Sequence, residues 1–235
     1  MNITPNGEHL LGTDKSGRDV LTRLLYGGRV SLLVGFSATL IVIFLGTLVG
    51  SIAGFFGGRV DSLLMRFTDF VLNFPFLVFV IVLNTILHGK VDGLWVLIGL
   101  IGLLSWGGVA RIVRSKILAE KENEYVLAAI SIGCSPAKVI AKHLLPNVMS
   151  TIIVQATLLF AGLIIAESGL SYLGFGVPQK TPSWGNMLAF ANEPDVLQDK
   201  PWMWMPPALA ITFTILSINF IGEGLKDAMN PKSTR

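Results

Sequence analysis

The chain has 235 residues, of which 52% are hydrophobic and only 14% charged, with a formal net charge of +3. Soluble domains are about a quarter charged, so this composition, together with a mean hydropathy of +0.66, indicates an integral membrane protein. No basic stripe with interleaved aromatic residues is present, which argues against nucleic-acid binding. The single cysteine, Cys134, excludes an internal disulfide and a metal site built on several cysteines.

Residues 1–30 are polar to amphipathic and have no apolar core near Met1, so they do not form a signal peptide. Val20, Leu21, Leu24 and Leu25 have helical spacing, which predicts a short interfacial helix. We expect residues 1–30 to form an extracytoplasmic or interfacial segment, residues 31–225 a transmembrane domain, and residues 226–235 a cytoplasmic tail.

Five later segments are apolar enough to cross a bilayer, which takes about 20 residues. They are expected at residues 31–56, 67–87, 94–113, 149–165 and 208–221, with a short loop before residue 67. The sequence therefore predicts an all-α fold, a polytopic bundle of transmembrane helices with five spans.

Glycines recur at every fourth position near the end of the first span: Gly46, Gly50, Gly54 and Gly58. Such spacing places them on one helix face, where small residues allow close helix packing in lipid. The second span contains Asn73 and Pro75, which could mark a bend lining a transport pathway, although packing is the simpler interpretation. Glu167, at the end of the fourth span, is expected to be a structural hydrogen-bonding group rather than a ligand.

A polar interruption, residues 120–147, separates the third and fourth spans. Its first half has helical spacing, in Tyr125, Ala128, Ala129 and Ile132, and Gly133 is expected to end that helix. Ser135 and Pro136 form an N-cap followed by proline at the first helical position. We expect a second short helix from Pro136 that Pro146 stops.

Most Lys and Arg residues fall on the side of this interruption, which the positive-inside rule makes cytoplasmic. Five spans then place residues 1–30 outside, although this segment carries four basic residues and no preceding hydrophobic stretch. Translocation of such a segment is unfavourable, so a sixth, N-terminal span is expected to precede the chain.

The interruption resembles the EAA loop of the membrane subunits of ABC importers. The pattern of that loop is Glu-Ala-Ala, three residues, Gly, nine residues, Ile, one residue and Leu-Pro. Matching positions are Ala128, Ala129, Gly133, Leu145 and Pro146, whereas Leu127 replaces the glutamate and His143 the isoleucine. Residues 9–35, 166–188 and 222–232 are also similar to stretches of the C-type permeases of peptide and nickel importers.

The resemblance implies a type I ABC importer permease in the bacterial cytoplasmic (inner) membrane, which moves di- or oligopeptides by alternating access. It implies a heterodimer with a second permease, two ABC ATPases that use ATP and Mg, an extracytoplasmic solute-binding protein and surrounding lipid. The coupling loop would be residues 114–147. Its expected contact residues are Glu124, Tyr125, Ala128, Ala129, Gly133, Pro136, Leu145 and Pro146.

We expect no cofactor, metal or catalytic residue in this chain itself. It lacks a phosphate-cradling Gly-Lys-Ser/Thr loop and a paired nucleophile and base, and His9, His88 and His143 are scattered. Alternatives are a nickel or metal-chelate permease, an ion-coupled secondary transporter, a membrane-embedded enzyme, or a fragment without function. The secondary transporter is disfavoured because the sequence shows no inverted repeat, and the enzyme because catalytic pairs inside the spans are missing.

Overall fold

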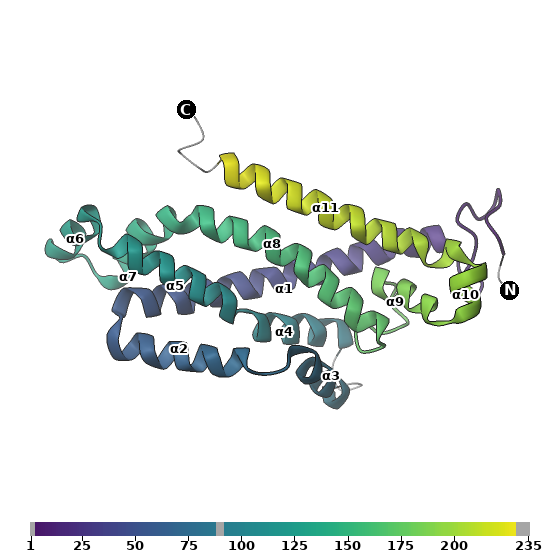
Figure 1. Ribbon diagram of the computed structural model, residues 1–235, viewed down its shortest axis with the longest axis horizontal. Coiled ribbons are helices and arrows are strands. Elements are labelled where there is room, and N and C mark those ends of the chain that lie inside the picture. The colour runs from purple at the N-terminus through teal and green to yellow at the C-terminus, as the bar shows by residue number, and fades with distance from the viewer. Residues whose placement is uncertain (1–2, 88–91, 229–235) are drawn as a thin grey trace. The chain divides into compact units, whose positions relative to one another are not determined.

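The computed structural model describes residues 3–87 and 92–228, which form helices and connecting loops (Figure 1). The described elements are α1 (Val20–Phe56), α2 (Gly58–Leu72), α3 (Phe76–Leu87), α4 (Gly93–Ser105), α5 (Gly107–Lys121), α6 (Glu124–Ser131), α7 (Pro136–Val139), η1 (Ile140–Leu144), α8 (Leu145–Tyr172), α9 (Trp184–Leu188), η2 (Ala189–Asn192), α10 (Pro194–Asp199), η3 (Pro201–Met203) and α11 (Met205–Ala228). This content confirms the predicted all-α class.

Three helical stretches are each long and apolar enough to cross a membrane: Val20–Phe56, Pro136–Tyr172 and Met205–Ala228. Two bent pairs, α2 with α3 and α4 with α5, meet the same test only together, so the described residues supply three spans, or up to five if each pair is one span. Three of the five segments expected from hydropathy lie within single helices, and the other two, residues 67–87 and 94–113, each contain the break of a bent pair. A span must bury a long apolar stretch in lipid, so its position follows from composition alone.

Two boundaries differ from the sequence prediction. The expected interfacial helix is the beginning of α1, which runs from Val20 to Phe56 without a break. The carboxylate of Asp19 accepts the Thr22 backbone N–H at 2.7 Å and so caps this helix. The loop expected before residue 67 is the amphipathic helix α2, because the turn is completed by Gly57 and Gly58, with φ values of 65° and 53°.

Three of the four spaced glycines lie where α1 meets α5. A Cβ added to Gly46 would lie 2.5 Å from the Val109 Cβ, and one added to Gly54 would lie 2.9 Å from the Arg114 carbonyl oxygen. Gly50 is equally close to the α5 backbone. The inclusion of Gly58 on this face was wrong, because α1 ends at Phe56 and Gly58 begins α2 after the turn, with open space around its Cα.

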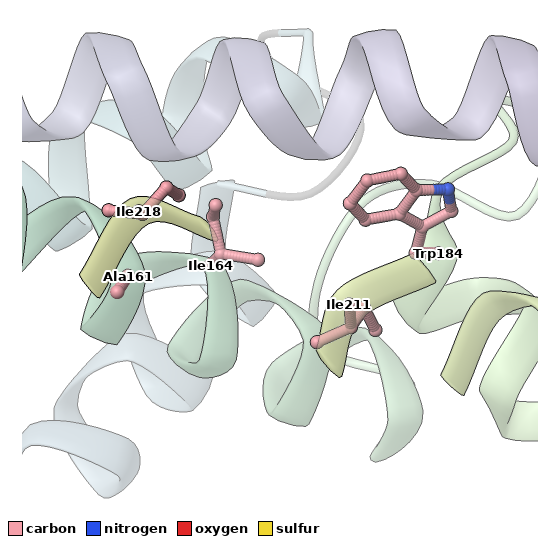
Figure 2. Packing of buried hydrophobic residues seen from close by; sticks show 5 residues of the cluster. All are labelled: Ala161, Ile164, Trp184, Ile211 and Ile218. Atoms are coloured by element: carbon pink, nitrogen blue, oxygen red, sulfur yellow. The ribbon is translucent and has the colours of Figure 1, made fainter. Parts of the chain in front are cut away.

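The chain divides into two compact units, and helices α1, α8 and α11 each contribute residues to both. Unit 1 comprises residues 1–38, 77–101 and 160–219. Its apolar core combines the buried Trp184 of α9 with side chains from α8 and α11 (Figure 2). The members of this core are Ala161, Ile164, Trp184, Ile211 and Ile218.

Unit 2 comprises residues 39–76, 102–159 and 220–235 and contains the predicted coupling loop. Within it, α2 packs along α5 (Figure 1). Arg114 forms a two-pronged ion pair with Asp61, and Arg111 lies 2.6 Å from the Asp69 carboxylate. Each arginine of α5 lies beside its aspartate on α2, so the two ion pairs hold the helices in one alignment along their length. Only residues 226–228 of the expected tail are described, as the end of α11, and His88 lies outside the described residues.

Candidate coupling site

Helix α6 begins after Asn123 and carries the exposed Glu124 in its first turn. Its end is a complete Schellman motif. The Cys134 N–H donates to the Ala129 carbonyl at 3.1 Å, and the Gly133 N–H donates to the Ile130 carbonyl at 3.0 Å. Gly133 has φ of +83°, a left-handed conformation that favours glycine. The prediction that Gly133 ends this helix is therefore confirmed.

Tyr125 ties α6 to both neighbouring helices. Its hydroxyl donates to the Glu120 carboxylate at 2.5 Å and accepts an N–H from the Asn147 side chain at 3.0 Å. Asn147 also donates to the His143 carbonyl at 2.7 Å. Burial and the adjacent Glu120 carboxylate raise the pKa of Tyr125, so the phenol stays protonated and keeps its donor role. A displacement of α6 therefore acts on the end of α5 and on the start of α8 together.

The two central alanines of α6 point in different directions. Ala129 is 5% exposed and packs inward with the fully buried Val126, whereas Ala128 is exposed. Sequence spacing alone had assigned both alanines to a surface that another protein could approach. Because positions i and i+3 share a face, Ala129 joins Val126 in holding the loop together, and Ala128 remains available on the outside.

Large apolar side chains lie near the exposed Ala128, and none of the described residues covers them. Ile132 is 81% exposed, Leu127 48% and Ile130 40%. We call this surface, Leu127, Ala128, Ile130 and Ile132, the α6 edge. Exposed apolar clusters on a protein surface mark contacts with a partner or membrane. The expected contact residues did not include Leu127, Ile130 or Ile132, and only their exposure in the structure sets them apart from the buried Val126.

The second helix of the loop does not stop at Pro146. Helices α7, η1 and α8 form one continuous stretch, and the residues 140–144 between them are π-helical. The Leu145 N–H there donates to the Ile140 carbonyl, one residue further back than in an α-helix. This bulge precedes the position where Pro146 supplies no N–H, so the helix passes the proline rather than ending. The prediction that Pro146 stops the helix was wrong.

The remaining predicted residues lie in two places. Pro136 is at the first position of α7, and Leu145 is partly buried at the start of α8. Asn73 and Pro75 lie at the break between α2 and α3, where the Asn73 side chain donates to the Asp69 carbonyl at 2.8 Å and so caps the end of α2. This contact is local to the helix end.

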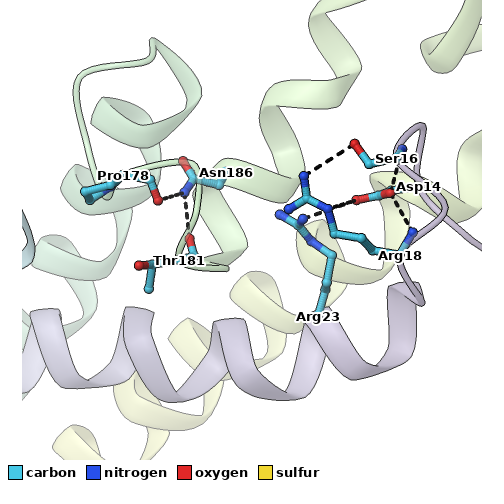
Figure 3. Close-up of polar contacts among 7 residues, drawn as sticks. All are labelled: Asp14, Ser16, Arg18, Arg23, Pro178, Thr181 and Asn186. Atoms are coloured by element: carbon cyan, nitrogen blue, oxygen red, sulfur yellow. Dashed lines mark hydrogen bonds and ion pairs between the residues drawn. The ribbon is translucent and has the colours of Figure 1, made fainter.

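A separate set of polar contacts shapes unit 1, and the sequence did not reveal it. The Asn186 amide donates at 3.3 Å to the Pro178 carbonyl and at 3.1 Å to the Thr181 carbonyl (Figure 3). It also donates to the Val177 carbonyl at 3.0 Å. The two N–H groups of this amide are shared among three backbone acceptors, and so hold the loop between α8 and α9 closed. In the same unit, the buried Asp14 carboxylate holds the Arg23 guanidinium at 3.1 Å.

Residues 3–87 and 92–228 contain no group of three or more His, Cys, Asp or Glu side chains that could hold a metal ion. The site is instead a rigid protein surface, built from a short helix with an apolar edge.

Comparison with known proteins places this chain in a family. Residues 46–235 match the family described as binding-protein-dependent transport system inner membrane component. The oligopeptide transport system permease protein OppC of Lactococcus lactis subsp. lactis is 43% identical, over 93% of this chain and 74% of its own length. The dipeptide transport system permease protein DppC of Bacillus subtilis is 42% identical, over 100% of this chain and 72% of its own length.

Solved structures share the fold at much lower sequence identity. An inward-facing MetNI methionine ABC transporter matches 90% of this chain and 98% of its own with a TM-score of 0.73 and 17% identity. An amino acid ABC transporter with histidines matches 89% of this chain and 95% of its own with a TM-score of 0.63. With most of its length inside the family match and 43% of its aligned residues identical to those of a permease, the chain belongs to the family of binding-protein-dependent transport system inner membrane components.

Proposed function

We propose that this chain is the membrane-spanning permease of an ATP-driven importer of di- or oligopeptides, and that the α6 edge receives the partner ATPase. The second permease of the complex would form a heterodimer with it. Membership in the family makes the chain an inner-membrane permease that is not itself catalytic, and ATP is used by partner ATPases. The coupling role rests on one observation. The apolar α6 edge is exposed, while hydrogen bonds and buried side chains hold the rest of α6 in place.

Three features support α6 as a docking element. Its apolar side chains are exposed, with Ile132 at 81%. Its centre is small, since Ala128 allows a partner to come close to the backbone. Its shape is held by the Schellman motif at Gly133 and by the buried Val126 and Ala129. A preformed apolar surface binds without first ordering itself, which lowers the cost of association.

The same geometry supports a route for movement. Pressure on α6 reaches α5 through the bond between Tyr125 and Glu120, and reaches α8 through Asn147. Helix α8 then continues through the membrane as part of the stretch Pro136–Tyr172. In this mechanism the ATPases close on ATP, and the permease changes between inward- and outward-facing states because ATP binds the two states unequally.

Peptides are the proposed substrates because the permeases similar to this chain are named for them, in Lactococcus lactis, Haemophilus influenzae and Bacillus subtilis. The nickel alternative has no comparable support among these relatives.

The test is Ala128→Arg in the complex reconstituted with its ATPases, second permease and binding protein. We expect loss of co-purifying ATPase and of ATP-driven uptake of a synthetic tripeptide, since a long cation cannot enter an apolar contact without cost. The matched control is Ala228→Arg, at the exposed end of α11, which should leave both unchanged. Unchanged uptake with Ala128→Arg would refute docking through the α6 edge. ATP-driven uptake of nickel instead of tripeptide would refute the peptide assignment.

A further inference from the structure

Glu167 is a fully buried carboxyl group near the end of α8, with 0% of its surface exposed. Within the described part of the chain its partners are serine hydroxyls and no cation. Ser171 lies at 2.7 Å, Ser31 at 3.0 Å and Ser168 at 3.4 Å, and Ser183 adds a further hydrogen bond. A buried carboxylate without a cation requires such donors to be stable. We call these five residues the Glu167 cluster.

Three of the four serines that surround Glu167 each bind a second partner. The Ser31 oxygen accepts the Trp184 backbone N–H at 3.1 Å, and the Ser171 oxygen accepts the Val177 N–H at 3.1 Å. The Ser183 oxygen accepts the Asn186 N–H at 3.1 Å. A hydroxyl has one proton to donate, so each serine that accepts a backbone N–H directs its own proton to the carboxylate. Glu167 thereby fixes the backbone of the loop between α8 and α9 through its serines.

The cluster joins three segments of unit 1 that are distant in sequence. Ser31 belongs to α1, Glu167 and Ser171 belong to α8, and Ser183 immediately precedes α9. The segments approach closely, because a Cβ added to Gly28 would lie 2.8 Å from the Trp184 ring and one added to Gly185 would lie 2.7 Å from the Ser168 Cα. The Trp184 indole also donates to the Leu24 carbonyl at 3.0 Å. Movement of α8 therefore cannot occur without moving this loop.

The cluster lies at the opposite end of α8 from the coupling loop. The continuous stretch Pro136–Tyr172 has 37 residues, about 55 Å of helix at 1.5 Å per residue, which exceeds a bilayer core of about 30 Å. Its first residues adjoin α6, and Glu167 lies in its last two turns. If α6 lies on the ATPase side, as proposed above, the loop held by Glu167 belongs to the side of the membrane where substrate is delivered.

We infer that Glu167 is a positioning residue for transport. It uses Ser31, Ser171 and Ser183 to fasten the loop between α8 and α9 to α8. Through this connection, the ATPases on one side of the membrane sense a peptide-loaded binding protein on the other side. The inference rests on the proposed function. Glutamine at this position keeps the size but replaces one acceptor oxygen by a donor group, which leaves a serine proton without an acceptor.

The experiment compares ATP hydrolysis by the reconstituted complex with and without binding protein loaded with a synthetic tripeptide. We expect Glu167→Gln to assemble and to keep basal hydrolysis, but to lose stimulation by the loaded binding protein about tenfold, a typical size for coupling between distant sites. Ser171→Ala removes one donor at less structural risk and should lose part of the stimulation. Combined with Glu167→Gln it should cause no further loss, because both changes break one network.

The matched control is Asp199→Asn, an exposed carboxylate in the same unit, which should keep full stimulation. Full stimulation in Glu167→Gln would overturn the inference. Equal loss of basal and stimulated hydrolysis, in Glu167→Gln and Ser171→Ala alike, would also overturn it, because that pattern indicates damage to the fold alone. A native complex that loaded binding protein does not stimulate would refute the proposed function, and the inference with it.

Discussion

Replacing Gly50 by alanine should force α1 and α5 apart. The added Cβ would lie 2.5 Å from the Ala110 carbonyl oxygen and 2.9 Å from the Val113 Cβ. Ordinary van der Waals contact begins at 3.4 Å, so the α5 backbone must retreat by about 1 Å, because a carbonyl in a helix cannot rotate aside. Overpacking of this kind costs about 1 to 3 kcal/mol.

The matched control is Gly108→Ala, also a helical glycine of unit 2, but with nothing within 4 Å of its added Cβ. At this exposed position alanine should be neutral or stabilising by about 0.5 to 1 kcal/mol. The assay is unfolding of the purified chain in mixed micelles with increasing dodecyl sulfate, followed by far-ultraviolet circular dichroism. The midpoint of Gly50→Ala should fall below the native midpoint and that of Gly108→Ala should not. Equal midpoints for the two variants would refute the packing argument.

Two further predictions concern polar contacts outside the spans. The hydrogen bond from the Thr22 backbone N–H is the largest cause of the lowered pKa of Asp19. The stability that the Asp19 carboxylate contributes is therefore present above its unfolded pKa of about 3.9 and is lost as pH falls through the lower folded pKa. The difference in melting temperature between the native chain and Asp19→Asn should therefore shrink on acidification, and a constant difference would contradict this. Tyr125→Phe removes the contacts with Glu120 and Asn147 and should cost about 1 kcal/mol. Amide exchange in α6 should then be about fivefold faster, and an unchanged rate would contradict the bracing role.

The sequence alone was sufficient for the spans and for the elbow of the coupling loop. The five apolar segments all lie in helices long enough, singly or in pairs, to cross a membrane, because the cost of placing polar groups in lipid leaves little freedom for their position. Gly133 ended α6 as predicted, since a left-handed helix end is a local preference of glycine that does not depend on distant residues.

Only the tertiary structure decided which residues of these elements are exposed and which face the interior. Ala128 and Ala129 are the same residue type at adjacent positions. Ala128 is exposed, whereas Ala129 is only 5% exposed and packs against the loop interior. Pro146 reads as a helix end, but a π-helical turn before it carries the helix onward. The gathering of Ser31, Ser171 and Ser183 around Glu167 spans more than 150 positions of sequence, and such contacts arise from how helices pack together rather than from any local pattern.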